Sequence, residues 1–170
     1  IQLLRKEGDS AGGIVACSIT GLPAGIGECV FDKLDAVLAH AIMSIGAVKG
    51  IEFGAGFSAS DLYGSTNNDS MNVENNGSSV SFATNNSGGI LGGISNGNEI
   101  FFRAAIKPVP SIYKVQKTVG ADENGKFYDT QLQIKGRHDV CLCPRIVPVI
   151  EAMTAITLCD LFLQNLPAKC

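Results

Sequence analysis

Three consecutive side chains with complementary chemistry occur in the segment Lys135-Gly136-Arg137-His138-Asp139. The planar guanidinium of Arg137 can bind a phosphate or a carboxylate through two parallel hydrogen bonds. The carboxylate of Asp139 can accept a proton or orient a proton donor. Because neighbours in sequence need not converge in space, a solvated turn explains the same spacing equally well. The cluster is a candidate for an anion-binding site that also transfers a proton.

Two other segments could contribute to such a site. The run Gly88–Gly97 (GGILGGISNG) carries five glycines in ten residues, so its main chain could approach a ligand and its N–H groups could form an anion nest. Two tight turns before a strand are the alternative. The proline-stiffened segment Lys107–Ser111 offers a cation and a hydroxyl that could hold a phosphate. Its alternative is an exposed lysine at a strand end.

Composition narrows the class of protein. The 170 residues are 45% hydrophobic and 17% charged, as in one ordinary globular domain. The net charge of -3 gives no reason to expect nucleic-acid binding. The most apolar stretch, Ile146 to Leu163, is interrupted by polar residues, so we expect no membrane span. Reduced thiols, in a cytoplasmic or plastid-stroma setting, are favoured over disulfides for the six cysteines, which are Cys17, Cys29, Cys141, Cys143, Cys159 and Cys170.

Hydrophobic periodicity predicts the elements that must position these segments. Strands are expected at Gly13–Gly21, Val48–Phe57 and Glu99–Lys107, and a weaker strand at the edge of a sheet is expected at Lys126–Lys135. One helix is expected over Glu28–Ile45. A second is expected from Pro148, in its first turn, to Leu163. This order predicts an α+β fold in which helices cover sheet faces.

A segment rich in asparagine, serine and glycine runs from residue 64 to about residue 87. It has few apolar residues with which to order itself, so it is predicted to be a mobile loop. Loops of this length inside a compact domain are often lids or ligand-binding segments, which is the alternative.

Six motifs resemble those of the chorismate synthase family in order and spacing. They are GDSAGG (Gly8–Gly13), GLPAGIGECVFDKLDAVLAHAIMSIGAVKGIEFGAGF (Gly21–Phe57), GS-x-x-ND (Gly64–Asp69), NNSGGILGGISNG (Asn85–Gly97), KPVPSI (Lys107–Ile112) and KGRHDVCLCPRIVPVIEAM (Lys135–Met153). The resemblance covers nearly the whole chain but only the later half of the family's chain. It implies that residues 1–170 are the C-terminal portion of a single domain, an α+β sandwich of antiparallel sheets and helices.

The resemblance also implies a reaction. Family members convert 5-enolpyruvylshikimate 3-phosphate into chorismate and phosphate, an anti 1,4-elimination in the shikimate pathway of aromatic amino acid biosynthesis. These enzymes are carbon–oxygen lyases acting on phosphates, and they require reduced FMN, which some of them reduce with NADPH. They are typically homotetramers. No metal is implied.

Residue roles follow from the same match. Asp139 matches a catalytic aspartate that assists proton transfer at the flavin ring, and Arg137 matches a flavin-binding arginine. The other positions that match flavin contacts are Gly46, Ala47, Gly92, Lys107, Pro108, Val109, Pro110 and Ser111. Gly46 stands where the family commonly has Asn or Pro, so it could contribute only its backbone.

The family's earlier half would supply two catalytic histidines and most of the substrate-binding arginines. Neither His40, within a predicted helix, nor His138 can replace those histidines. The chain opens on Ile1 and is expected to be a fragment that is inactive alone. Two alternatives are a non-catalytic module that binds FMN or phosphate, and a purely structural piece.

Overall fold

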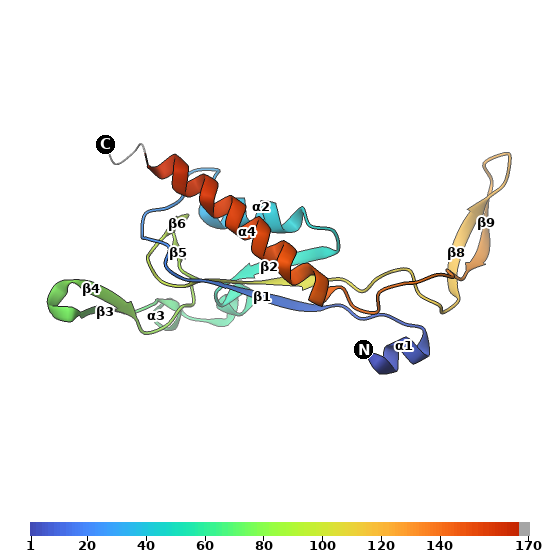
Figure 1. The fold of residues 1–170 in the computed structure, drawn as a ribbon, viewed down its shortest axis with the longest axis horizontal. Helices are drawn as coiled ribbons and strands as arrows, with labels where there is room; N and C mark the ends of the chain where they lie inside the picture. The colour runs from blue at the N-terminus through green and yellow to red at the C-terminus, as the bar shows by residue number, and fades with distance from the viewer. Residues whose placement is uncertain (167–170) are drawn as a thin grey trace.

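A three-stranded antiparallel sheet forms the centre of the protein (Figure 1). The computed structural model describes residues 1–166, and Cys170, predicted to be a reduced thiol, lies outside the described residues. The sheet order is β1 (Gly13–Ile19), β7 (Ile100–Ile106) and β2 (Val48–Phe53). Helices α2 (Leu34–Met43) and α4 (Cys143–Asn165) pack against one face of it. The described chain therefore has the predicted α+β architecture.

Alternation along β7 explains the position of the core. Every second residue of this strand, Ile100, Phe102, Ala104 and Ile106, is buried and faces the helices. Because side chains of a strand alternate between the two faces, this pattern covers one face of the sheet and leaves the other open. The ring of Phe102 packs 5.7 Å from that of Phe53 on β2, measured between centroids. From α2, Ile42 joins the same core.

The strands predicted at Gly13–Gly21 and Glu99–Lys107 are confirmed, and β2 ends earlier than predicted, at Phe53. The helix predicted from Glu28 begins only at Leu34. The preceding residues form a loop in which Phe31 is exposed and has a left-handed backbone. The N–H of Leu34 instead donates to the carbonyl of Gly93, at 2.9 Å. Tertiary contact with the glycine-rich run therefore sets the start of α2.

Helix α4 begins at Cys143, five residues before the predicted start at Pro148. Pro144 occupies its first turn, where a missing N–H has little effect, and Pro148 lies inside the helix. Among the described residues, α4 is long and apolar enough to cross a membrane, which the sequence had not led us to expect. Its inner face, which includes Ile146, Ile150 and Leu158, is buried in the core.

Two hairpins project from opposite ends of the sheet (Figure 1). The strand predicted at Lys126–Lys135 is β9 (Phe127–Leu132). It pairs with β8 (Gln116–Ala121), a strand that we had not predicted, and does not join the edge of the central sheet. The second hairpin, β3 (Met71–Glu74) and β4 (Ser79–Phe82), occupies part of the segment at residues 64–87 that was predicted to be a mobile loop. The remaining elements are α1 (Gln2–Glu7), α3 (Gly64–Asn67), β5 (Ile90–Leu91), β6 (Ile94–Ser95) and the 3₁₀ helices Gly56–Asp61 and Asn75–Gly77.

Asp69 holds the base of the β3–β4 hairpin. Its carboxylate accepts hydrogen bonds from the Thr84 hydroxyl at 2.7 Å and from the backbone N–H groups of Asn86 and Ser87, at 2.7 and 2.9 Å. Burial works to raise the pKa of Asp69, but these hydrogen bonds together lower it below its usual value. The ionised carboxylate is therefore the form that stabilises the base of the hairpin.

Replacing Asp69 with alanine is expected to destabilise the docking of this hairpin by about 1–3 kcal/mol, since three donors lose a charged acceptor. In limited proteolysis at neutral pH, the hairpin between residues 70 and 82 should then be cleaved faster in the Asp69→Ala variant than in the parent protein. Because the folded pKa is lowered, this stabilisation is present above the unfolded pKa of about 3.9 and is lost as the pH falls through the folded pKa. Glu74→Ala, which removes an exposed carboxylate of β3, is the control. Equal cleavage of the two variants would contradict the role of Asp69.

Candidate functional site

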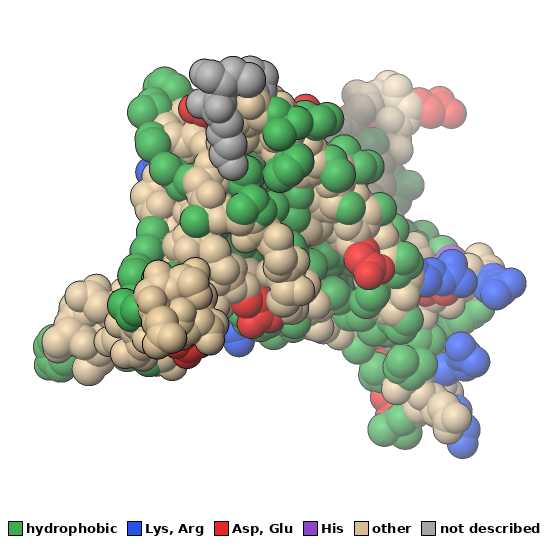
Figure 2. Space-filling view, turned by 60° about the vertical axis from the view of Figure 1, so that its left-hand side comes forward, with side chains coloured by type: hydrophobic (Ala, Val, Ile, Leu, Met, Phe, Trp, Pro, Cys, Tyr) green, Lys and Arg blue, Asp and Glu red, His purple; other side chains and the backbone are tan. Residues whose placement is uncertain are grey.

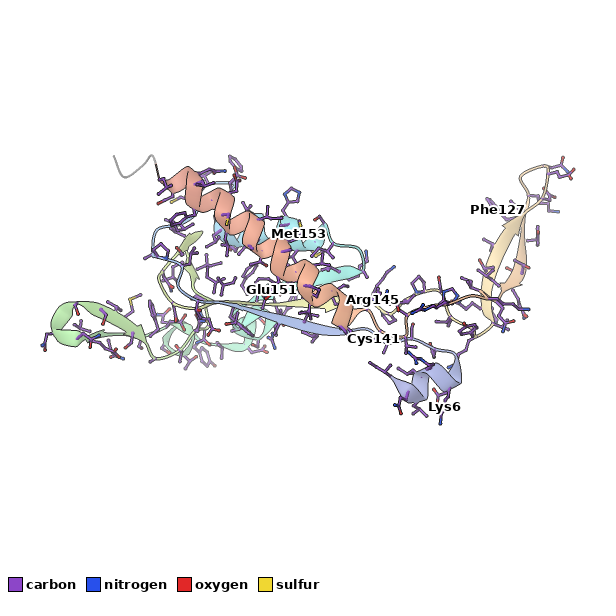
Figure 3. The ribbon with its side chains drawn as sticks, in the orientation of Figure 1. Lys6, Phe127, Cys141, Arg145, Glu151 and Met153 are labelled. Carbon is purple, nitrogen blue, oxygen red and sulfur yellow. The ribbon has the colours of Figure 1, made fainter. Side chains whose placement is uncertain are left out.

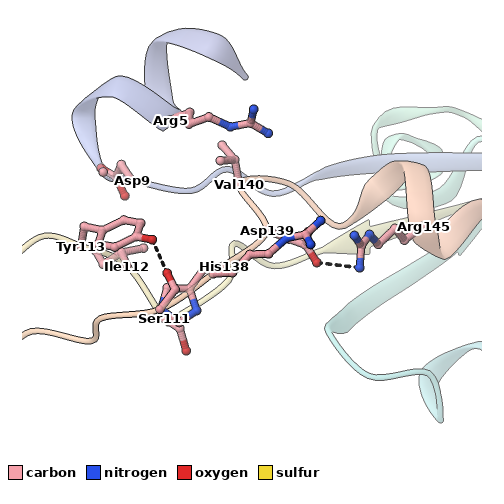
Figure 4. A pocket seen from close by; sticks show the side chains of 12 residues that line it. Arg5, Asp9, Ser111, Ile112, Tyr113, His138, Asp139, Val140 and Arg145 are labelled. Carbon is pink, nitrogen blue, oxygen red and sulfur yellow. Dashed lines mark hydrogen bonds and ion pairs between the residues drawn. The ribbon is translucent and has the colours of Figure 1, made fainter.

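A cavity of about 550 Å³ lies at the N-terminal end of α4 (Figure 4). Three segments that are far apart in the sequence line it, at residues 5–9, 111–113 and 136–140, and Arg145 of α4 adds a fourth wall. In Figure 3, Cys141 and Arg145 mark the end of α4 that meets these segments, whereas Phe127 lies far out on β8–β9. The cavity is therefore set by loop docking and not by one continuous element.

Backbone hydrogen bonds join the three segments. The N–H of Ala11 donates to the carbonyl of Val140 at 2.8 Å, and the N–H of Tyr113 donates to the carbonyl of Gly8 at 3.0 Å. The hydroxyl of Ser10 donates to the carbonyl of Val109 at 2.6 Å. Tyr113 also donates its phenol hydroxyl to the carbonyl of Gly136. The GDSAGG motif thus lies between the other two segments and ties them together.

At two positions of that motif the local structure requires glycine. Gly8 ends α1 with a left-handed φ of 69°, a conformation that glycine adopts without steric cost. Gly12 lies so close to the end of β7 that a Cβ would clash with the carbonyl oxygen of Ile106 and would lie tightly against the ring of Pro108, at 3.1 Å. The motif therefore serves the close approach of the Gly8–Gly13 segment to the end of β7.

Positive charge dominates the walls of the cavity. Arg5, Arg137 and Arg145 all line it, and Lys and Arg side chains gather on one side of the molecule in Figure 2. The carboxylate of Asp139 lies 3.1 Å from the guanidinium of Arg145 (Figure 4). Arginine forks bind phosphates and carboxylates with two hydrogen bonds each. The cavity is therefore suited to an anionic ligand.

Asp9 is the second carboxylate of the cavity. The ammonium of Lys114 lies 2.6 Å from it, and this hydrogen bond, with help from the N–H of Ser10, holds the pKa of Asp9 below its usual value. The same contact raises the pKa of Lys114. Asp9 is thus already paired from outside the cavity, and among residues 1–166 Arg5 and Arg137 form no ion pair that would compete with a ligand.

The structure brings several of the predicted site residues together. Ser111, Arg137 and Asp139 line the cavity, and Lys107–Pro110 lead into it from the end of β7. Gly46 and Ala47 form the turn between α2 and β2, where the N–H of Lys107 donates to the carbonyl of Ala47 at 2.9 Å. These positions share one end of the sheet.

Gly92 is not brought to this cavity. It lies in the turn between β5 and β6, with a φ of 62° and open space around it. The next residue, Gly93, accepts the hydrogen bond from Leu34 at the N-terminal end of α2, whereas the cavity lies beyond the other end of the sheet. The glycine-rich run therefore belongs to a different surface of the chain.

Sequence reasoning missed four residues of the cavity, which are Arg5, Asp9, Tyr113 and Arg145. Arg5 and Asp9 are more than 100 residues from the other walls, so only docking of the segments places them there. Arg145 had a local signal, because it follows Asp139 by six residues at the start of a helix. The helix start predicted at Pro148 concealed that signal.

The cysteines beside the cavity have no sign of metal or nucleophile chemistry. Cys141 and Cys143 are half-buried free thiols, and burial raises the pKa of Cys143. Among residues 1–166, no group of three His, Cys, Asp or Glu side chains is placed to hold a metal ion.

Comparisons with known proteins agree on one family. The sequence profile described as chorismate synthase matches residues 1–163. Chorismate synthase of Maridesulfovibrio salexigens is 52% identical over 163 residues, which cover 96% of this chain and 44% of that protein. The enzyme of Archaeoglobus fulgidus is 55% identical over 160 residues, covering 94% of this chain and 43% of that protein.

A solved structure shares the fold. A crystal structure of chorismate synthase superposes with a TM-score of 0.75 at 30% identity, over 97% of this chain and 41% of that one. The chain thus spans less than half the length of the relatives that it matches. With the sequence profile matching nearly every described residue, the chain belongs to the chorismate synthase family.

Proposed function

We propose that the chain is the C-terminal part of a chorismate synthase, the lyase that converts 5-enolpyruvylshikimate 3-phosphate into chorismate and phosphate. The observation that carries the proposal is the convergence of Arg137, Asp139 and Ser111 on one arginine-lined cavity, in a chain of this family. We further propose the family's homotetrameric assembly for the full-length protein, in the cytoplasm or plastid stroma, with no nucleic-acid or membrane partner.

Reduced FMN is the proposed cofactor, and the residues present fit it. The cavity volume of about 550 Å³ is within the usual range for small-molecule sites, roughly 300–1,000 Å³. Its arginines suit a phosphate-bearing ligand. Arg137 and Ser111 would hold the cofactor from inside the cavity. The backbone at Gly46–Ala47 and at Lys107–Pro110 would line the approach to it. The contact between Gly92 and FMN that the resemblance implies does not belong to this cavity, because Gly92 lies on a different surface.

The chain's own residues would act by binding, orientation and proton transfer. When held by these residues, FMN would supply the electron donation that the elimination requires. Arg137 and Arg5, which line the cavity, bind the anionic groups of the ligands. The carboxylate of Asp139 assists removal of the proton that is lost in the elimination. NADPH is proposed only as a source of electrons for the flavin.

The proposal is tested by an anaerobic assay that follows phosphate release from 5-enolpyruvylshikimate 3-phosphate in the presence of chemically reduced FMN. The full-length protein that carries this chain is expected to turn over, whereas residues 1–170 alone are expected to show no release above a no-protein control. The physical reason is that the chain supplies fewer than half of the residues of its relatives. Turnover by the chain alone would refute this expectation. Tight FMN binding without turnover by the full-length protein would favour a non-catalytic flavin-binding module.

A further inference from the structure

We propose that Arg145 is a positioning residue that holds the carboxylate of Asp139 in its working orientation inside the cavity. The inference rests on the proposed function, since it assigns Arg145 a role in the reaction proposed for Asp139. Its starting observation is the ion pair between the Arg145 guanidinium and the Asp139 carboxylate, at 3.1 Å (Figure 4). Arg145 lies within the Lys135–Met153 motif, but the resemblance gave it no role.

Helix stability alone does not explain why an arginine stands in the first turn of α4. The first turn of α4 contains no acidic residue, and the N-cap, Leu142, makes no side-chain capping hydrogen bond. A cation in the first turn lies at the positive end of the helix dipole, where it is unfavourable. Pairing with Asp139 compensates for that position. Since side chains of the pair are 66% and 35% exposed, the pair adds little to the stability of the fold.

The main chain of Arg145 is anchored at the start of α4. Its N–H donates to the carbonyl of Leu142 at 2.9 Å, which fixes the start of α4. The next residue, Ile146, is buried in the core against the central sheet. The guanidinium therefore extends from a rigid helix, whereas Asp139 lies in a loop whose position depends on contacts at its two sides.

Those contacts leave the carboxylate itself free to rotate. Val140 accepts the hydrogen bond from Ala11, and Gly136 accepts the one from the Tyr113 hydroxyl, so the main chain on either side of Asp139 is held. Among residues 1–166, Arg145 is the only group that forms an ion pair with Asp139. Proton transfer depends steeply on the position of the donor and acceptor. The arginine thus sets which way the carboxylate points.

A double-mutant cycle in the full-length protein tests this role. Arg145→Met is expected to lower kcat about 10- to 100-fold, with KM and FMN affinity within about threefold of the parent, because a misplaced group costs up to about this factor. Arg145→Lys should restore part of the lost kcat. In the Asp139→Asn background, Arg145→Met should change kcat by less than about threefold, since coupled residues are not additive.

Arg5→Met is the matched control. This arginine lines the same cavity but forms no ion pair with a carboxylate among residues 1–166. Its effect is expected to be the same factor with and without Asp139→Asn. Equal effects of Arg145→Met in the two backgrounds, or a loss expressed mainly in KM or in FMN affinity, would overturn the positioning role.

A readout independent of turnover separates this inference from the proposed function. In a crystal structure of the Arg145→Met protein, the Asp139 carboxylate is expected to leave the orientation that it has in the parent. An unchanged carboxylate would overturn the inference even if the parent is an active enzyme. A parent protein that binds FMN but releases no phosphate would overturn the proposed function, while displacement of the carboxylate would still support the role of Arg145 in orienting it.

Discussion

The Asp139→Asn variant of the full-length protein is expected to lose about 100- to 10,000-fold in kcat, the range usual for removing a group that transfers a proton. Asparagine keeps the size of the side chain but cannot accept the proton. FMN affinity should change little, because Arg137 and the Lys107–Ser111 segment are proposed to hold the cofactor. Turnover is measured by anaerobic phosphate release, and FMN binding by quenching of flavin fluorescence.

Asp129→Asn provides the matched control for that result. Asp129 lies on β9, opposite Val119 of β8, in a hairpin that projects away from the cavity. It should leave kcat near the parent value. An Asp139→Asn protein that keeps more than about a tenth of the parent kcat would show that Asp139 takes no part in proton transfer.

Phe102→Ala is expected to destabilise the folded protein by about 3–5 kcal/mol, the usual range for truncating a buried phenylalanine. Phe102 is fully buried at the centre of β7 and packs against Phe53. The residues around it come from the sheet and from both helices, so the cavity left by the ring cannot collapse easily. The free energy of unfolding is measured by guanidinium chloride denaturation of the full-length protein.

Phe127→Ala makes the same chemical change at a surface position. Phe127 is 74% exposed near the tip of the β8–β9 hairpin (Figure 3), so its truncation should cost less than about 0.5 kcal/mol in the same experiment. Similar losses for the two variants would mean that Phe102 is not part of a packed core between the sheet and the two helices. Because β7 leads directly into Lys107, Phe102→Ala is also expected to weaken FMN binding.

Elements with a strong internal pattern could be predicted from the sequence. The alternation from Ile100 to Ile106 is a local property of the chain, and it identifies both the strand and its buried face. The candidate anion-binding residue Arg137 and the candidate proton-transfer residue Asp139 were also indicated by their types and by the motifs around them. The same motifs indicated the family that the comparisons confirm.

Boundaries that depend on distant contacts could not be predicted in this way. Residues 28–33 have helical periodicity, yet α2 begins at Leu34 because its first N–H bonds to Gly93. The strand β9 lies where a strand was expected. Whether it joins the central sheet or forms a hairpin with β8 depends on which strand lies beside it in the folded chain, and that strand is β8. Such choices are made by tertiary pairing, which outweighs local propensity.

The sequence by itself determined the α+β class, the central strands, the family and the identity of the groups that could bind an anion and move a proton. Only the tertiary structure decided which of them meet: it brings Arg5 and Arg145 to Arg137 and Asp139 and leaves Gly92 on another surface. The physical reason is that periodicity and residue type are properties of neighbours in the chain. The cavity, by contrast, is made by hydrogen bonds such as that from Ala11 to Val140, which join segments more than 100 residues apart.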